Sequence, residues 1–237
     1  RRAGANGSDR AGGLDEVARE CQGEGVRAGR RAVFIRFAGC NLWSGREQDR
    51  AGAICTFCDT NFVGTDGAGG GKFADALSLA AAAVAFWGEG EEWRYAVLTG
   101  GEPMLQVDDA LIHALHARGF EIAIETNGTL PVHPGIDWVC VSPKAGSTVV
   151  QNSGDELKLV WPQPGSDIAA MEGWSFIHHL IQPLDDTNAQ DNAQACIDFV
   201  LTHPRWRMSA QGSGIAVING HVRSTNTQTA LRDQGQG

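Results

Sequence analysis

The chain has 237 residues, 42% of them hydrophobic and 20% charged, which is enough to bury a sizeable core, most simply as one domain. Nineteen Lys and Arg against 28 Asp and Glu give a net charge of −9. This charge disfavours a DNA or RNA surface, because such surfaces must neutralise phosphates. The sequence has no apolar run of about 18 residues and no apolar stretch of a secretory signal at its start. We therefore expect a cytoplasmic protein without a membrane contact.

Both ends of the chain are polar. Residues 1–13 and 212–237 are rich in Gly, Ser, Asn, Gln and Arg and lack a sustained helical or strand period. We expect irregular tails there, on either side of one folded domain over residues 14–211. The first segment of that domain, LDEVAREC at residues 14–21, carries four charges. It is expected to form a short helix or a loop.

Runs rich in apolar or β-branched residues predict strands, and stretches of helical length and composition lie between several of them. The predicted strands are residues 32–38, 94–99, 120–126, 137–141, 156–160 and 176–181. The predicted helices are residues 72–87, 103–118 and 189–202. This β-α-β alternation predicts a parallel sheet, either open or curled into a full or partial barrel. Such sheets bind ligands at the carboxyl ends of their strands.

Polar turns follow four of the predicted strands. They are GGEP at residues 100–103, ETNG at 125–128, SPK at 142–144 and QP at 182–183. Gly, Pro and Asn also form ordinary turns. Four such turns at the ligand-binding end of a parallel sheet favour one site assembled from several loops.

Three cysteines follow the first core strand with the spacing C-x14-C-x2-C: Cys40, Cys55 and Cys58, with Phe57 before the last. Three thiolates leave one position of a tetrahedral ion, or one iron of a 4Fe-4S cube, without a protein ligand. A structural zinc site would need a distant fourth ligand, since residues 41–62 contain no further His or Cys. The other cysteines are isolated and are expected to be small buried or incidental side chains: Cys21, Cys140 and Cys196.

The cysteine motif followed by GGEP resembles the radical S-adenosylmethionine (SAM) superfamily. More narrowly, the chain resembles the 7-carboxy-7-deazaguanine synthases of the queuosine and 7-deazapurine pathway. The motifs that carry this resemblance lie in order within residues 22–211: QGEG at 22–25, RFAGCNLW at 36–43, CDT at 58–60, TGGEP at 99–103, ETNG at 125–128 and SPK at 142–144. The resemblance implies a partial α/β barrel and a lyase that converts 6-carboxy-5,6,7,8-tetrahydropterin to 7-carboxy-7-deazaguanine with loss of ammonia.

The resemblance also implies roles for individual residues, with no catalytic side chain beyond the cluster and SAM. A 4Fe-4S cluster would be held by Cys40, Cys55 and Cys58, and its open iron would chelate SAM. Contacts to SAM would come from Gly100, Gly101, Glu102, Ser142 and Lys144. The hydroxyl of Thr60 would help to hold Mg²⁺, a cation that prefers oxygen ligands.

The pterin substrate is expected to contact a set of polar side chains: Gln22, Glu24, Arg36, Thr99, Glu125 and Asn127. Among these, Arg36 can pair with a carboxylate through two parallel hydrogen bonds. The amide and carboxylate groups can match the donors and acceptors of a pterin edge. The family further implies a flavodoxin or similar reductant and a homodimer.

The sequence departs from the family pattern in two places. The first cysteine spacing is fourteen residues, where three is usual in the superfamily. Gln211 is followed by Gly212 and a polar tail, so the histidine with which the family completes its substrate pocket has no counterpart. The one histidine beyond Gln211 is His221, expected to be a solvated tail residue. We therefore expect weakened substrate binding.

Two alternatives stay open at this point. One is a different radical SAM enzyme, such as an activase that makes a glycyl radical on a protein partner. The other is a catalytically impaired scaffold or a structural zinc protein, for which the missing histidine is the main argument.

Overall fold

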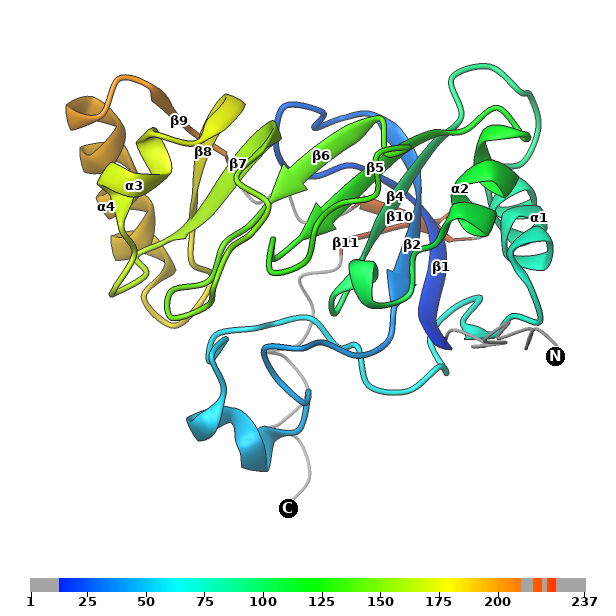
Figure 1. Ribbon diagram of the computed structural model, residues 1–237, viewed down its shortest axis with the longest axis horizontal. Helices are drawn as coiled ribbons and strands as arrows, with labels where there is room; N and C mark the ends of the chain where they lie inside the picture. The colour runs from blue at the N-terminus through cyan, green and yellow to red at the C-terminus, as the bar shows by residue number, and fades with distance from the viewer. Residues whose placement is uncertain (1–12, 210–214, 219–220, 225–237) are drawn as a thin grey trace, which may run out of the picture.

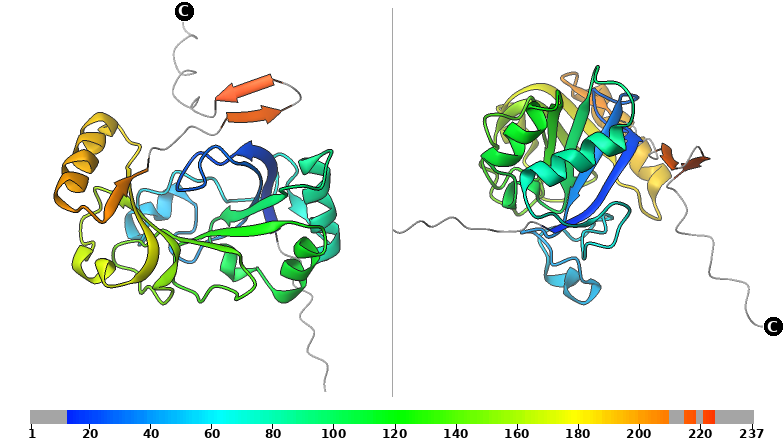
Figure 2. Two further views of the ribbon diagram at one scale, coloured as in Figure 1. Left: turned by 90° about the horizontal axis from the view of Figure 1, so that it is seen from above. Right: turned by 90° about the vertical axis from the view of Figure 1, so that its right-hand side faces the viewer.

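The computed structural model describes residues 13–209, 215–218 and 221–224 (Figure 1). The strands of these residues form one curved sheet in the order β11-β10-β1-β2-β4-β5-β6-β7-β8-β9, with β3 beside β1. Neighbouring strands from β2 to β9 are parallel, whereas β1 is antiparallel to β2. The order begins at β11 and ends at β9 without closing, so the predicted partial barrel is confirmed (Figure 2).

The elements have the following bounds. The strands are β1 (Gly13–Cys21), β2 (Arg31–Phe37), β3 (Gly71–Lys72), β4 (Tyr95–Gly100), β5 (Glu121–Thr126), β6 (Trp138–Val141), β7 (Ser153–Trp161), β8 (Ser175–Pro183), β9 (Trp206–Met208), β10 (Ile215–Ile218) and β11 (His221–Ser224). The helices are α1 (Ala76–Trp87), α2 (Asp109–His116), α3 (Ile168–Glu172) and α4 (Ala189–Thr202), with 3-10 turns η1 (Glu47–Gly52) and η2 (Pro103–Leu105). All six predicted strands are present.

The central strands are covered on both faces. Four consecutive residues are buried in β2, at positions 32–35, and five in β4, at positions 95–99. This pattern is typical of parallel strands with helices on their outer side. One apolar core lies where α1 and α2 pack on β1, β2, β4 and β5, and a second lies where α3 and α4 pack on β7 and β8 (Figure 1).

Capping residues decide where the helices begin. Asp75 caps α1 by accepting a 2.7 Å hydrogen bond from Ser78 N, so this helix starts four residues after the predicted position. The helix predicted from Pro103 is divided, because Asp108 caps α2 by accepting a 2.9 Å bond from Leu111 N. Ordered side-chain acceptors of this kind satisfy the free N–H groups of a first helical turn.

The segment Gly13–Cys21 is a strand, and the expected helix or loop is wrong. It pairs with β2 along most of its length, and Leu14 and Val17 are buried in the core. Several of its charged side chains line a cavity instead of the core, among them Glu16 and Arg19. Charges can face a polar cavity without the cost of burial in an apolar core, so they do not prevent strand formation here.

Part of the expected C-terminal tail also forms strands. Strands β10 and β11 pair with each other, and β10 joins β1 at the pair Glu20–Ala216. The other residues of both expected tails, residues 1–12, 212–214, 219–220 and 225–237, lie outside the described part of the chain, as does the side chain of His221. Within the described part, no helix is both long and apolar enough to cross a bilayer.

Candidate active site

A cavity of about 1090 Å³ lies at the carboxyl ends of β2, β4, β5, β6, β7 and β8. Its wall also includes the segment that follows β2, residues 38–62, which we call the cysteine loop. All site residues predicted from the sequence line this cavity except Glu102. The volume is at the upper end of ligand sites, which span roughly 300–1,000 Å³, so a cofactor and a small substrate fit together.

The cysteine loop leaves β2 and returns beside it. Gly39 N donates to Phe62 O at 3.1 Å, which closes the loop at its base. Arg50 supports the interior of the loop. Its guanidinium carbon lies 4.0 Å from the centroid of the Trp43 ring, and its Nη1 donates a hydrogen bond to the carbonyl of Cys58 at 3.1 Å. The three cysteines are therefore carried by a loop with internal support.

The three thiols fit a cube better than a single ion. Within residues 13–209, no three Cys, His, Asp or Glu side chains converge closely enough to hold one metal ion. A cube places each thiolate on a different iron, whereas zinc needs its ligands around one centre. A hydrogen bond with Cys58 lowers the pKa of Cys55 to about 7. The same hydrogen bond raises the pKa of Cys58, and burial raises that of Cys40, so among the three thiols Cys55 is the one that most readily forms the thiolate that binds iron.

Two glycines bring the end of β4 against the base of the cysteine loop. Gly100 has a φ of +113°, and a Cβ on Gly101 would lie 1.9 Å from Gly39 O. Gly101 N donates to Phe37 O at 3.0 Å. Only glycine permits this approach of two backbones, so the GGEP motif sits directly beside the cysteines.

Glu102, by contrast, does not line the cavity. Its buried carboxylate accepts hydrogen bonds from Thr126 Oγ1 at 2.7 Å, Asn127 N at 2.9 Å and Met104 N at 3.0 Å. Burial nevertheless raises the pKa of Glu102. These bonds tie the turn after β4 to the turn after β5, so the side chain has a bracing role in this structure.

Lys144 lies near the second and third cysteines. Its Nζ donates to Ser142 O at 2.7 Å and Ser142 Oγ at 2.8 Å, and lies 5.9 Å from the centroid of the Phe57 ring. Burial lowers the pKa of Lys144. The SPK turn therefore presents a cation and a hydroxyl next to the predicted cluster.

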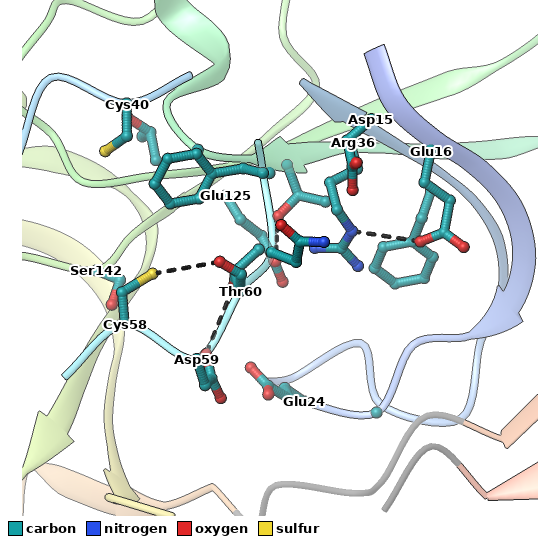
Figure 3. A pocket seen from close by; sticks show the side chains of 18 of the residues that line it. Asp15, Glu16, Glu24, Arg36, Cys40, Cys58, Asp59, Thr60, Glu125 and Ser142 are labelled. Atoms are coloured by element: carbon teal, nitrogen blue, oxygen red, sulfur yellow. Dashed lines mark hydrogen bonds and ion pairs between the residues drawn. The ribbon is translucent and has the colours of Figure 1, made fainter. Parts of the chain in front are cut away.

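The residues expected to contact the substrate form a hydrogen-bonded group. Glu125 accepts from Gln22 Nε2 at 3.1 Å and from Thr99 Oγ1 at 3.0 Å. Arg36 lies 3.5 Å from Glu16, measured from Nε to Oε2. Figure 3 shows Cys40 and Cys58 on one side of the cavity and Arg36 with Glu16 on the other. A substrate carboxylate and a cluster would thus occupy different sides.

Asn127 lines the cavity but is bonded within the protein. Its Nδ2 donates to Asn41 Oδ1 at 2.9 Å, and its Oδ1 accepts from Thr129 N at 2.9 Å and Thr129 Oγ1 at 2.7 Å. It therefore links the cysteine loop to the end of β5.

Thr60 follows the last cysteine and is half-buried. Its hydroxyl lies 3.4 Å from Asp59 Oδ1, and its carbonyl lies 4.0 Å from Cys58 Sγ (Figure 3). A hydroxyl and a carboxylate side by side at the cavity wall are oxygen donors of the type that Mg²⁺ prefers.

Comparison with known proteins decides the family. The 7-carboxy-7-deazaguanine synthase of Bordetella pertussis is 58% identical over 198 residues, covering 84% of this chain and 94% of that protein. The synthase of Caulobacter vibrioides is 57% identical over the same shares. The chain belongs to the 7-carboxy-7-deazaguanine synthase family. A scan against protein-family models finds no match.

A solved structure agrees with this membership. The crystal structure of QueE from Escherichia coli superposes with a TM-score of 0.63 at 25% identity, covering 85% of this chain and 94% of that one. This family of radical SAM enzymes uses SAM and a 4Fe-4S cluster, and the three thiols described above fit the cluster. Family membership favours the synthase over the activase and the zinc-protein alternatives.

Two cavity residues of this synthase-family chain received no individual role from the sequence, although the turn that carries Gln182 was expected at the site. Lys158 is buried in β7 and lies 2.5 Å from Glu24 Oε2 and 3.5 Å from Glu125 Oε1. Gln182 is buried at the end of β8, and its Oε1 has no hydrogen-bond partner among the described residues. A lysine between two leucines of a predicted strand was the available signal for Lys158, because such a charge needs a buried partner.

Proposed function

We propose that this chain converts 6-carboxy-5,6,7,8-tetrahydropterin to 7-carboxy-7-deazaguanine with loss of ammonia, using SAM and a 4Fe-4S cluster. The proposal rests on family membership and above all on one observation: the cysteines, the GG turn and the polar side chains expected to contact the pterin share one cavity. When bound, the cluster and SAM supply the one-electron chemistry that starts ring contraction.

The residues of the chain have positioning roles in this proposal. Cys40, Cys55 and Cys58 hold the cluster. Arg36 binds the substrate carboxylate, because only its Nε is engaged by Glu16 among the described residues. Its two terminal nitrogens then remain to make a bidentate pair. Glu125 accepts N–H donors of the pterin ring, with Thr99 and Gln22 fixing its orientation.

The finer parts of the proposal concern partners. Mg²⁺ is held by Thr60 together with water and the substrate, supported by the neighbouring oxygen of Asp59. A flavodoxin or similar protein supplies the electron, and the enzyme is a cytoplasmic homodimer. The reductant and the homodimer are carried over from the family resemblance.

Anaerobic reconstitution tests the proposal. The protein is loaded with iron and sulfide, reduced in the presence of SAM, and given the pterin. We expect iron–sulfur absorption and equal amounts of 7-carboxy-7-deazaguanine and ammonia. Single Ala variants of Cys40, Cys55 and Cys58 should lose both absorption and product.

The matched control is Cys196→Ala, because Cys196 is buried in α4 and does not line the cavity. This variant should keep the cluster. Stoichiometric zinc without iron–sulfur absorption would refute the cluster, and SAM cleavage without conversion of the pterin would instead favour the impaired-scaffold alternative.

A further inference from the structure

Lys158 lies between two acidic residues at the wall of the cavity. Its Nζ is 2.5 Å from Glu24 Oε2 and 3.5 Å from Glu125 Oε1. Glu24 belongs to the QGEG motif, Glu125 ends β5, and Lys158 is in the middle of β7. Three segments far apart in the sequence therefore meet at one ammonium group.

This group carries one positive charge against two negative charges. Burial alone would raise the pKa of Glu125, but the charge of Lys158 and the hydrogen bonds from Gln22 and Thr99 hold it below its ordinary value. Burial alone would lower the pKa of Lys158, but the charges of Glu125 and Glu24 raise it well above its ordinary value.

Other titratable side chains surround Lys158 and its two acidic partners. Around it on the neighbouring elements are Arg36 of β2, Tyr95 of β4, Cys140 of β6, Lys144 after β6 and Glu156 of β7. Arg36 is paired with Glu16. Lys158 is thus the cation in direct contact with both carboxylates among the described residues.

We propose that Lys158 is a positioning residue that fixes Glu24 and Glu125 as paired acceptors for the amino and ring N–H donors of the pterin. It thereby selects an amino-substituted ring over the same ring with an oxo group in that place. The inference rests on the function proposed above. Lys158 neutralises one of the two carboxylate charges of Glu24 and Glu125, so one negative charge remains. N–H donors of a substrate would compensate this charge, whereas the lone pair of an oxo group would be repelled by it.

Binding experiments on the cluster-loaded protein test this role. Lys158→Met removes the charge at similar volume, Lys158→Arg keeps it, and Lys72→Met is the control at an exposed lysine. We measure the affinity of each variant for the pterin, for its 2-oxo counterpart and for SAM. Lys158→Met should bind the pterin about 10- to 100-fold more weakly and prefer it less over the oxo ring. Its SAM affinity should be unchanged, and Lys158→Arg should recover most of the loss.

The pH dependence of binding separates this role from a merely structural one. Without the cation, the raising effect of burial on the pKa of Glu125 loses its main counterweight. The protonated form is the poorer acceptor, so the pterin affinity of Lys158→Met should rise as the pH increases through the neutral range. The wild type and Lys72→Met should be flat over this range.

Two results would overturn the inference while leaving the proposed function intact. One is unchanged pterin affinity in Lys158→Met. The other is a parallel loss for the pterin, the oxo ring and SAM, which would indicate general disruption. If the wild type itself neither binds nor converts the pterin, the proposed function fails, and this inference fails with it.

Discussion

Polar side chains around the cavity differ in how far their atoms are already bonded within the protein. Glu102 and Asn127 have partners from neighbouring turns, so they hold the cavity in shape. Thr60 and Gln182 have atoms left for a ligand: the Thr60 hydroxyl has only a long contact to Asp59, and the Oε1 of Gln182 has no partner among the described residues. Free polar atoms at a cavity wall are the better candidates for ligand contacts.

Thr60→Ala tests the magnesium proposal. Removing one oxygen ligand should reduce pterin turnover at limiting Mg²⁺ about ten-fold or more, while SAM cleavage falls less. Thr60→Ser keeps the oxygen and should retain most turnover. Turnover and 5′-deoxyadenosine are measured together while Mg²⁺ is varied, and turnover that survives chelation of all divalent ions would contradict the role.

The cavity residues could be predicted from sequence where short motifs carry them. The cysteine triplet and the GGEP and ETNG turns are local, and nearly all the residues taken from them line the cavity. Lys158 could not be placed, because its partner Glu24 is 134 residues away. The bracing role of Glu102 was also missed, since it depends on a neighbouring strand.

At the scale of elements, the QGEG loop, residues 22–30, is held from several sides. Glu156 of β7 accepts from Val26 N at 3.2 Å and from Trp138 Nε1 at 2.8 Å. Gly25 has a φ of +74°, and a Cβ there would lie 2.2 Å from Glu156 Oε2. The loop that carries Glu24 is therefore clamped to β7.

Glu156→Ala should loosen this clamp. It leaves two partly buried donors, Val26 N and Trp138 Nε1, without an acceptor; the cost in the free energy of unfolding is about 1 kcal/mol, the low end for an unpaired donor because both sites are partly open to water. The Michaelis constant for the pterin should also rise, because Glu24 loses its fixed position. Glu156→Gln keeps an acceptor and serves as the control. Denaturant unfolding and steady-state kinetics check both effects, and equal kinetics in Ala and Gln variants would argue against the clamp.

Strands with long runs of buried residues could be predicted from the sequence. Strands β2 and β4 are buried on both faces and show as apolar runs. Strand β1 was missed because its charges face the cavity. The hairpin β10–β11 was missed although Asn219-Gly220, a dipeptide typical of two-residue hairpin turns, separates its strands in the sequence.

At the scale of the whole molecule, the segment after β9 joins the two ends of the barrel domain. The described chain passes directly from β9 to Ser209, whose hydroxyl accepts from Gly25 N at 3.0 Å. From the family resemblance we expect the closing histidine just beyond Gln211, where this chain has Gly212 and Ser213. The QGEG loop is thus anchored by Ser209, two residues before Gln211 in the sequence.

Replacing residues 212–214 with Thr-His-Lys, which keeps strands β10 and β11, should tighten pterin binding. One hydrogen bond to a polar or charged ligand group corresponds to about ten- to a hundred-fold in affinity. Cluster content and SAM affinity should stay the same, because their predicted ligands all precede this segment. Equal pterin affinity in the native chain and the chimera would mean that other residues replace the histidine.

The closed base of the cysteine loop limits what the cluster can do for the fold. A backbone hydrogen bond already joins Gly39 to Phe62 at the base of the cysteine loop. The cluster would therefore cross-link only short stretches inside this loop. A cross-link stabilises a fold by restricting the unfolded chain, and this effect grows with the length of chain that it closes. The expected ligands Cys40 and Cys58 enclose the 3-10 turn η1 and no strand of the barrel, so iron and sulfide would order the interior of this loop without joining one strand of the sheet to another.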